Sequence, residues 1–283
     1  MNMSTDPARV WLITGASSGI GRALATAVLD RGERVVATAR ERDRVAEFER
    51  RHPGRALAAS LDVADADQAR ATIDAAVGAF GRIDVVVNNA GYGLFGALEE
   101  LADDELRRQF ETNVFGALNV TRAALPQLRR QRRGHIVQMS SLEGVAPALA
   151  GESAYAATKF AVEGLCEALA REVGHLGVRV TIVEPGPVRT DFASGAVAKP
   201  PRIDDYDASV GDALRLFAQL AGNQPNDPAR VAAGIIEAVD ADRPPLRLAL
   251  GTEALEAIRD KLDGQRRELD AWEEVARSTT IAT

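Results

Sequence analysis

Short apolar runs alternate with longer amphipathic stretches along most of this chain, and this alternation limits the folds open to it. The apolar runs have the length of strands and cover residues 10–14, 34–39, 55–61, 83–88, 134–140, 178–184 and 246–250. The stretches between and after them have helical spacing and cover residues 22–31, 43–51, 67–80, 103–130, 153–175, 229–240 and 252–277. Nearly continuous apolar strands separated by helices indicate parallel pairing with both faces of the sheet covered. The sequence therefore predicts an α/β fold with a doubly wound, mainly parallel sheet in a single domain.

The first predicted strand ends in a glycine-rich turn. Residues 15–21 read Gly-Ala-Ser-Ser-Gly-Ile-Gly and lead directly into the first helix. Glycines let the backbone approach a ligand, and a helix N-terminus offers unpaired N–H groups to a pyrophosphate. The pattern favours a Rossmann-type dinucleotide-binding fold. Its spacing, Gly-x3-Gly-x-Gly, differs from the commoner Gly-x-Gly-x2-Gly and also suits simple tight packing.

Polar residues and glycines follow the carboxyl ends of the other predicted strands. They are Arg40, Asp62, the Asn-Asn-Ala-Gly segment at 88–91, Ser140 with Ser141, and Pro185 with Gly186. Right-handed crossovers bring these strand ends to one edge of the sheet, where ligands of open α/β sheets bind. We therefore expect a single ligand site along this edge.

Arg40 lies at the end of the second predicted strand, nineteen residues after Gly21. A dinucleotide-binding fold presents a residue to the adenosine ribose at this place, and an acidic residue there would accept hydrogen bonds from a free 2′-hydroxyl. Arginine instead pairs with a 2′-phosphate through its fork of donors. We predict that NADP(H) is preferred and that NAD(H) is possible. Arg42 is a lesser candidate, Glu41 complicates the assignment, and Arg40 could also simply cap a strand edge.

Tyr155 and Lys159 are four residues apart in a predicted helix and so lie on the same face. An ammonium beside a phenol favours the phenolate, so we expect Lys159 to lower the pKa of Tyr155 and make it a proton donor or acceptor. Ser141 adds a hydroxyl that can hydrogen-bond the same substrate oxygen. By itself, a Tyr-x3-Lys pair is also an ordinary helix face.

Taken together, these motifs resemble the short-chain dehydrogenase/reductase family over about residues 10–239. The residues that carry the resemblance are Thr14-Gly15-x3-Gly19-x-Gly21, Asn88-Asn89-Ala90-Gly91, Asn113, Ser141, Tyr155-x3-Lys159 and Pro185-Gly186. The joint pattern is specific, whereas each piece alone is not. Within the family, the sequence looks most like the branch of 17β-hydroxysteroid and retinol dehydrogenases.

The resemblance implies a set of site residues and no metal. The implied catalytic residues are Ser141, Tyr155, Lys159 and Asn113, the last supporting a water-linked proton path to the lysine. The implied cofactor-binding residues are Gly15, Ser17, Ser18, Gly19, Ile20, Gly21, Arg40, Asp62, Val63, Asn89, Ala90, Gly91, Tyr155, Lys159, Pro185, Gly186, Val188 and Thr190.

Ser141 is chosen over Ser140 because only one of two adjacent residues at a strand end can face the substrate. In the family, glycine stands three residues after the catalytic serine, and Gly144 has this position relative to Ser141. Ser140 is then expected on the cofactor side. Two departures from the family pattern are the fourteen-residue step to Tyr155 and the presence of Gln138 where asparagine is frequent.

Residues 191–227 lose the rhythm of strands and helices, which is typical of a lid or substrate loop. Tyr206, Leu214, Phe217 and Leu220 could line an apolar pocket, although the last three also have the spacing of one buried helical stripe. With Tyr92, Leu94 and Phe95, they indicate a lipophilic carbonyl or alcohol substrate. The alternatives are an NAD-linked alcohol dehydrogenase and a non-catalytic dinucleotide-binding regulatory protein.

The predicted organisation is a flexible lead at 1–9, a dinucleotide-binding oxidoreductase domain at 10–250 and a C-terminal helical extension at 251–283. We expect this extension to pack on the outside through Leu255, Ile258, Leu262, Leu269 and Trp272. Small residues on the helix at 153–175 favour a homodimer or homotetramer; they are Ala154, Ala157, Ala161, Gly164 and Ala168.

The composition argues against several other classes of protein. A net charge of −7 disfavours a nucleic-acid partner, and one cysteine with three histidines leaves neither a disulfide framework nor a zinc site of Cys and His. No uninterrupted apolar run reaches about 18 residues, so no membrane span is expected. A cytoplasmic location follows from the cysteine usage.

Overall fold

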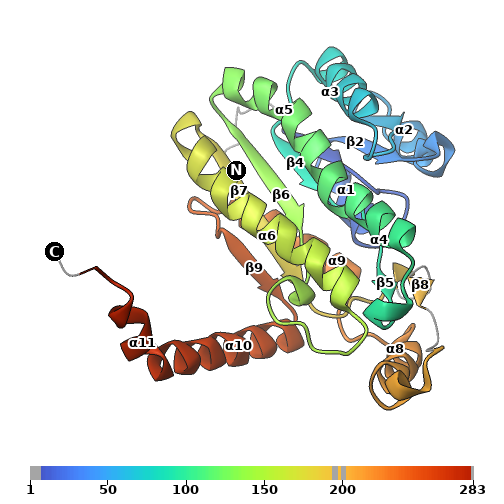
Figure 1. Cartoon of the computed structure of the whole chain (residues 1–283). Coiled ribbons are helices and arrows are strands. Elements are labelled where there is room, and N and C mark those ends of the chain that lie inside the picture. Colours follow the sequence, from blue (N-terminus) through green and yellow to red (C-terminus); the bar gives the residue numbers. More distant parts are fainter. Residues whose placement is uncertain (1–7, 193–196, 199–201, 282–283) are drawn as a thin grey trace.

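Seven parallel strands form the centre of the protein in the computed structural model, which describes residues 8–192, 197–198 and 202–281 (Figure 1). The strands lie in the order β3-β2-β1-β4-β6-β7-β9, and each neighbouring pair is parallel. Their bounds are β1 Val10–Ile13, β2 Arg34–Ala39, β3 Ala56–Ser60, β4 Val85–Asn88, β6 Gly134–Met139, β7 Val178–Pro185 and β9 Arg247–Leu250. The predicted doubly wound parallel sheet is confirmed. Residues 1–7 of the predicted lead, and Pro200 and Pro201 of the predicted loop, lie outside the described residues.

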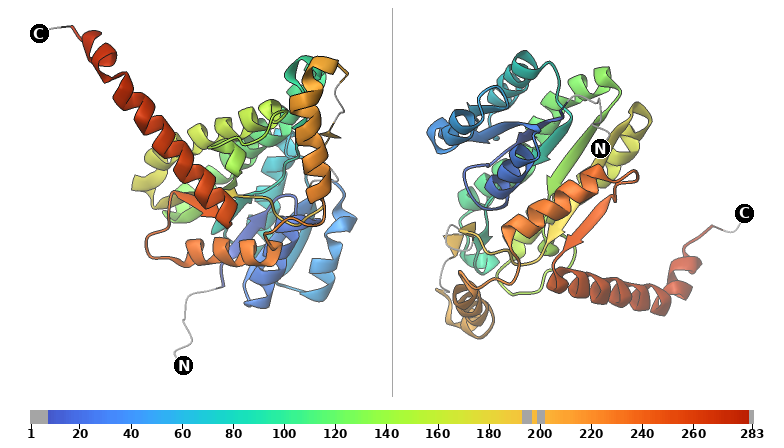
Figure 2. Two further views of the ribbon diagram at one scale, coloured as in Figure 1. Left: turned by 90° about the horizontal axis from the view of Figure 1, so that it is seen from below. Right: turned by 180° about the vertical axis from the view of Figure 1, so that it is seen from behind.

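Helices cover both faces of this sheet (Figures 1 and 2). α1, α2 and α9 pack on one face, and α3, α5 and α6 pack on the other. Their bounds are α1 Gly19–Asp30, α2 Ala46–Arg51, α3 Ala66–Phe80, α5 Ala117–Gln131, α6 Ser153–Val173 and α9 Pro228–Asp240. Within the part of the chain that the structure describes, no helix combines the length and the apolar character needed to cross a membrane.

The two apolar layers follow from the alternation of side chains along each strand. Trp11 and Ile13 of β1 pack toward α1 and α9, whereas Val10 and Leu12 pack toward α3, α5 and α6. All four side chains are completely buried. Burial of each large apolar side chain contributes about 1.5–3 kcal/mol, which explains why strands with both faces covered are apolar throughout.

The predicted single helix at 103–130 is interrupted. The structure has α4 (Asp103–Phe110), a π-helical turn η3 (Glu111–Gly116) and then α5. Asn113 lies buried in this turn, and its side chain bonds to groups outside the helix. Asparagine competes with helical hydrogen bonding in this way, so the local widening has an identifiable cause.

The expectation of an irregular segment at 191–227 is wrong for much of its described part. It contains two short helical turns, η6 (Asp204–Tyr206) and η7 (Asp207–Gly211), followed by α8 (Asp212–Leu220). It also supplies β8 (Val197–Ala198), which pairs with β5 (Leu94–Phe95) in a second, two-stranded sheet that the sequence pattern did not predict. This sheet fixes the segment beside the residues that follow β4.

The C-terminal extension forms α10 (Thr252–Ala271) and α11 (Glu273–Ser278), and α10 projects away from the sheet (Figures 1 and 2). Only its first turns contact the body, where Ala254 and Ile258 pack against the segment after β6. The expected packing of the other apolar residues is wrong, since their side chains are 41–73% exposed: Leu255, Leu262, Leu269 and Trp272.

Candidate active site

The glycine-rich turn after β1 is locked to the segment after β4. The side-chain amide of Asn89 donates hydrogen bonds to the carbonyl oxygens of Thr14 at 2.8 Å and Gly15 at 3.2 Å. A Cβ placed on Gly21 would lie 2.5 Å from the Asn89 Nδ2 atom and 2.6 Å from the Gly15 oxygen. Gly15 has a φ of 64° and lies against the backbone of Ala90. Glycine is therefore required here by close packing as well as by backbone conformation.

The first turn of α1 has the groups that a pyrophosphate needs. Ser18 precedes the helix without capping it through its side chain, so the N–H groups of Gly19, Ile20 and Gly21 start the helix without that partner. Aligned N–H groups and the positive end of a helix dipole attract phosphate. Thr190 lies close to the same turn, with its Cγ2 atom 3.3 Å from where a Cβ of Gly19 would be. These residues fit a bound dinucleotide whose diphosphate rests on α1.

The segment after β7 lies near the glycine-rich turn, since Thr190 approaches Gly19. β7 ends at Pro185, and the N–H of Gly186 donates to the carbonyl of Leu250 at 2.9 Å. Val188 pairs with Asn226 in an isolated bridge. The sequence-predicted nicotinamide segment is thus held by β9 and by the loop before α9, facing the glycine-rich turn.

Arg40 and Asp62 lie at the ends of β2 and β3, and both are exposed. Among the described residues, the Arg40 side chain has no hydrogen-bond or ion-pair partner. Arg42, the lesser candidate, is engaged, because its Nε donates to the Ala58 carbonyl at 3.1 Å and its guanidinium pairs with Glu49. The Asp62 carboxylate accepts from the N–H of Ala64 at 3.0 Å. Arg40 is therefore the arginine at this edge that is available to a ligand.

Val63 follows Asp62 and is buried. A Cβ placed on Gly116 would lie 2.5 Å from the Cγ2 atom of Val63. This contact anchors the end of β3 to the π-helical turn.

Ser141, Tyr155 and Lys159 converge where β6 meets α6. The three side chains are 6–8% exposed. The Lys159 Nζ atom lies 5.4 Å from the centre of the Tyr155 ring and donates to the carbonyl of Met139 at 2.9 Å. Ser141 follows β6 directly, and its hydroxyl acts to lower the pKa of Tyr155. The arrangement brings a phenol, an ammonium and a hydroxyl together.

The electrostatics of this group differ from the sequence expectation. Burial raises the pKa of Tyr155 above its ordinary value, and the carboxyls of Glu143 and Glu152 raise it further. Burial lowers the pKa of Lys159 to about 8, although the carboxyls of Glu143 and Glu163 act to raise it. The expected lowering of the Tyr155 pKa by Lys159 does not set the net direction, because desolvation opposes both the phenolate and the ammonium. Tyr155 is held in its protonated form.

Asn113 links the segment after β4 to α6. Its Oδ1 accepts from the N–H of Tyr92 at 3.0 Å, and its Nδ2 donates to the Tyr92 carbonyl at 2.9 Å and to the Thr158 hydroxyl at 3.1 Å. Thr158 directly precedes Lys159 on α6. Gly91 lies against the same oxygen, since a Cβ there would be 3.0 Å from it. Asn113 therefore holds the backbone around the lysine.

Ser140 and Ser141 point in different directions, as adjacent residues at a strand end should. Ser140 Oγ lies 2.5 Å from where a Cβ of Gly144 would be, and the Glu163 side chain lies 3.2 Å from the same point, so Ser140 is on the side of Glu163. The expectation that Ser140 lies on the cofactor side stays a prediction. Ser141 is the serine that shares its side of the strand end with Tyr155.

Aromatic rings enclose the Tyr155 phenol. Phe95 lies edge-on to it at 5.6 Å between ring centres, and Phe192 lies at the same distance on a tilted plane. Phe217 of α8 packs on Phe95 at 4.8 Å. The sequence indicated Phe95 and Phe217 but missed Phe192, which no local pattern distinguishes. Tyr206 does not join this cluster, because its exposed hydroxyl donates to Glu99 at 2.8 Å.

Two acidic residues near the phenol were also missed. Glu143 lies two residues after Ser141, and its carboxyl is hydrogen-bonded to the Ser141 hydroxyl. Glu152 precedes α6 and accepts from the N–H of Leu149 at 3.0 Å. Burial raises the pKa of Glu152 to about 7. The signal available in the sequence was an acidic residue inside an otherwise apolar strand-to-helix connection.

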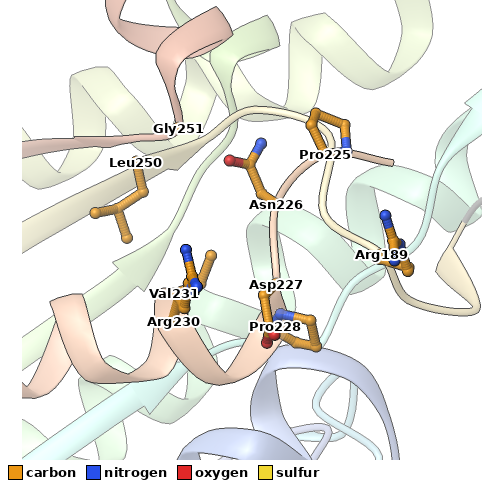
Figure 3. Close-up of a pocket in the computed structure, with 9 residues that line it drawn as sticks. All are labelled: Arg189, Pro225, Asn226, Asp227, Pro228, Arg230, Val231, Leu250 and Gly251. Carbon is orange, nitrogen blue, oxygen red and sulfur yellow. The ribbon is translucent and has the colours of Figure 1, made fainter. Parts of the chain in front are cut away.

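A cavity of about 690 Å³ lies beyond the ends of β7 and β9 (Figure 3). Figure 3 shows that its lining comes from Arg189, from the segment at 225–231 that begins α9, and from the junction of β9 with α10 at Leu250 and Gly251. The reactive side chains are not part of this lining. The cavity therefore adjoins the predicted nicotinamide segment at Arg189 and is separate from the group around Tyr155.

Known proteins are similar to this chain in both sequence and fold. The chain matches the short chain dehydrogenase family over residues 9–200. It is 38% identical over 249 residues to the oxidoreductase BOA17 of Botryotinia fuckeliana, covering 88% of this chain and 90% of that protein. It is 36% identical over 266 residues to retinol dehydrogenase 8 of Bos taurus, covering 87% and 83%.

Solved structures are similar over nearly the whole chain. A short-chain dehydrogenase from Streptomyces avermitilis has a TM-score of 0.89 and 44% identity, covering 98% of this chain and 100% of that one. A short-chain dehydrogenase/reductase from Burkholderia phymatum in complex with NAD has a TM-score of 0.80 and 26% identity, covering 91% and 95%. An alcohol dehydrogenase from the archaeon Thermococcus sibiricus, complexed with 5-hydroxy-NADP, has a TM-score of 0.70 and 27% identity, covering 86% and 95%. The sequence motifs, the fold and these matches agree, and the chain belongs to the short-chain dehydrogenase/reductase family of oxidoreductases.

Proposed function

We propose that this protein transfers a hydride between NADP(H) and a lipophilic substrate that is a ketone or aldehyde in one direction and an alcohol in the other. The observation that carries the proposal is the convergence of Ser141, Tyr155 and Lys159 at a strand end that faces the glycine-rich turn. A phenol kept protonated by burial can donate a proton to a substrate oxygen, and the neighbouring hydroxyl can hydrogen-bond the same atom.

Each residue of this group has a separate role in carbonyl reduction. The bound nicotinamide supplies the hydride. Tyr155 gives its phenol proton to the substrate oxygen as negative charge develops there. Lys159, fixed by the Met139 carbonyl, stabilises the phenolate that remains, and Ser141 donates a hydrogen bond to the oxygen. In alcohol oxidation the same groups act in reverse. Asn113 acts through the backbone that it holds, and we propose that it supports a proton path to Lys159.

The preference for NADP(H) is proposed from Arg40, which is exposed at the end of β2 and free of partners within the described residues. Its guanidinium suits a 2′-phosphate. One similar structure is a complex with NAD and another a complex with 5-hydroxy-NADP, so the fold accommodates both kinds of dinucleotide. Equal catalytic efficiency with NADH and NADPH would contradict the preference.

The lipophilic substrate is proposed from the aromatic rings around Tyr155. Phe95, Phe192 and Phe217 present apolar surface next to the reacting phenol. The relative retinol dehydrogenase 8 is named for a lipophilic alcohol. A panel of retinal, a steroid ketone and benzaldehyde, followed by NADPH absorbance, separates a lipophilic specificity from a general one.

We also propose a homodimer or homotetramer and a cytoplasmic location. Phe115 of η3 and Phe160 of α6 are each 47% exposed, and these two segments contact one another. A Cβ on Gly164 would meet no neighbouring atom, so α6 has room for another helix beside it. Cys166 is buried and unpaired, as suits a reducing compartment.

Replacement of Tyr155 by Phe tests the proposed function directly. The variant loses the proton donor but keeps the ring, so kcat should fall by about 10²–10⁴-fold. The affinity for NADPH, measured by quenching of protein fluorescence, should change little. Tyr206→Phe is the matched control, because the hydroxyl of this half-buried tyrosine donates to Glu99, away from the group around Tyr155. Persistent turnover by Tyr155→Phe would refute the mechanism, and NADPH binding without turnover by the wild type would favour a regulatory protein.

A further inference from the structure

Glu143 is a buried acidic residue in direct contact with the reactive group, and the proposed function gives it no task. It lies in the turn η4 (Leu142–Gly144), which connects β6 toward α6. The Ser141 hydroxyl donates a hydrogen bond to its carboxyl. A carboxyl at this place influences both neighbours, since its charge raises the pKa of Tyr155 and of Lys159.

Three elements pack against this turn and define the charges around Glu143. They are α6, β7 and α10. α10 meets the turn through the apolar side chains of Ala254 and Ile258, with Glu253 at the start of the helix. Of the ionisable residues on α6, Tyr155 and Lys159 interact electrostatically with Glu143, as does Glu152 just before the helix, and Glu163 lies beside Gly144 of the same turn.

These neighbours stabilise a negative charge on Glu143 less than burial destabilises it. Burial raises the pKa of Glu143, while the hydrogen bonds it accepts and the charge of Lys159 lower it; the net direction is upward. Glu163 and Glu184 are tied to Arg247 by hydrogen bonds of 2.6 Å, so this arginine is engaged elsewhere. Lys159 is the cation that acts on Glu143, and it too is buried.

The hydroxyl of Ser141 has one proton, and two acceptors compete for it. An ionised Glu143 can only accept a hydrogen bond, so it takes the Ser141 proton and leaves an oxygen lone pair toward the substrate. A protonated Glu143 can instead donate to the Ser141 oxygen, which leaves the Ser141 proton free to point at the substrate oxygen. Carbonyl reduction needs the second arrangement, because the substrate oxygen becomes negative and requires donors.

We propose that the protonated carboxyl of Glu143 is a positioning group that donates a hydrogen bond to Ser141 and so directs the Ser141 proton to the substrate oxygen. This role rests on the proposed function, since it requires Ser141 and Tyr155 to share one substrate oxygen. Ionisation of Glu143 reverses the Ser141 hydrogen bond. Reduction is therefore favoured below the pKa of Glu143 and declines as the pH rises through it.

Glu143→Gln and Glu143→Ala separate this role from a purely structural one. Glutamine keeps a donor toward Ser141 at every pH, whereas alanine removes it. The kinetic measurement uses NADPH and whichever of retinal, the steroid ketone or benzaldehyde gives the highest kcat. We expect Glu143→Ala to lose about tenfold in kcat, the value of one hydrogen bond of about 1.4 kcal/mol, with little change in KM. Glu143→Gln should restore kcat to within about twofold of the wild type and lose the decline with pH that Glu143 causes.

Infrared spectroscopy of the protein without added ligand gives an independent measurement. The C=O band of the protonated Glu143 carboxyl, identified as the band that Glu143→Gln loses, should be present in the wild type at the pH of maximal kcat. Glu152→Gln is the matched spectroscopic control, because Glu152 also has a raised pKa but bonds to Leu149 rather than to Ser141. It should lose its own band and retain that of Glu143. This measurement remains decisive if Glu143→Ala does not fold.

Three results would overturn the inference: wild-type kcat in Glu143→Ala, a kcat in Glu143→Gln as low as in Glu143→Ala, or an ionised Glu143 at the pH of maximal kcat. Failure of the proposed function is distinguished by Tyr155→Phe. If that variant is inactive and the Glu143 variants match the wild type, only the role of Glu143 is lost. If Tyr155→Phe remains active, the mechanism itself is lost.

Discussion

Arg40 differs from most residues of the predicted cofactor site because its side chain extends into solvent from the end of β2. Replacement by alanine removes the charge-assisted hydrogen bonds that a 2′-phosphate would receive, each worth about 1.5–3 kcal/mol. Arg40→Ala should therefore raise KM for NADPH by about 10–100-fold and change KM for NADH by less than about threefold. Initial-rate measurements with both cofactors check this.

Arg42→Ala is the control for this prediction. Arg42 already bonds to Glu49 and to the Ala58 carbonyl, so its loss should affect stability more than the choice of cofactor. An equal rise in KM for NADH and NADPH in Arg40→Ala would show that Arg40 supports β2 rather than selects the cofactor.

Gly21 is a glycine of the cofactor turn at which the structure leaves no room for a side chain. An added Cβ would meet Asn89 Nδ2 at 2.5 Å and the Gly15 carbonyl at 2.6 Å, so the turn after β1 must move. Gly21→Ala should lower the free energy of unfolding by about 1–3 kcal/mol and weaken NADPH binding. In Gly78→Ala, on α3, the new Cβ meets nothing within 4 Å, and a gain of up to about 1 kcal/mol is expected. Urea denaturation of both variants distinguishes crowding at Gly21 from a general effect of alanine.

At the scale of elements, Arg247 connects the edge strand β9 to α6 and β7. Its Nη1 donates to Glu163 and to Glu184 at 2.6 Å, and its Nη2 donates to Glu167 at 2.9 Å. Glu163 and Glu184 have side chains only 4% and 3% exposed, so removal of the arginine leaves two buried carboxyls without their cation. Arg247→Met should cost about 2–3 kcal/mol, less than a fully buried pair because Arg247 is itself 37% exposed. Arg243→Met, at an exposed position in the preceding turn, is the control in urea denaturation.

The same cluster makes stability depend on pH in a definite direction. Burial raises the pKa of Glu163 from 4.5 to about 7 in the folded protein. Between these values the folded state keeps a proton that the unfolded state releases, so the contribution of Glu163 to stability is lost as the pH rises through this range. Glu163→Gln should therefore show a smaller decline in the free energy of unfolding from about pH 5 to about pH 8 than the wild type. A steeper decline in Glu163→Gln would contradict the raised pKa.

At the scale of the whole molecule, the features that the sequence predicted correctly are those set by local residue patterns. The order of strands and helices follows from apolar periodicity, and the reactive strand ends follow from parallel connection of those strands. The π-helical turn at Asn113 depends on Tyr92, a partner distant in the chain. The raised pKa of Tyr155 depends on burial in the folded protein and on Glu143. The position of α10 was mispredicted because its apolar spacing indicates a face that needs a partner, whereas the body of the protein covers only its first turns.

The proposed self-association could use either of two exposed apolar surfaces. One contains Phe115 and Phe160 on η3 and α6, and the other contains Leu262, Leu269 and Trp272 on α10. The first surface is favoured, because Gly164 leaves space for a helix of a second copy to pack beside α6. The double variant Phe115→Glu/Phe160→Glu should therefore dissociate the oligomer into monomers in size-exclusion chromatography with light scattering, since burying two carboxylates in an apolar interface is costly. Leu269→Glu is the matched control and should retain the wild-type mass. Dissociation by Leu269→Glu alone would assign the interface to α10 instead, and the circular dichroism spectrum of each variant verifies that the monomer remains folded.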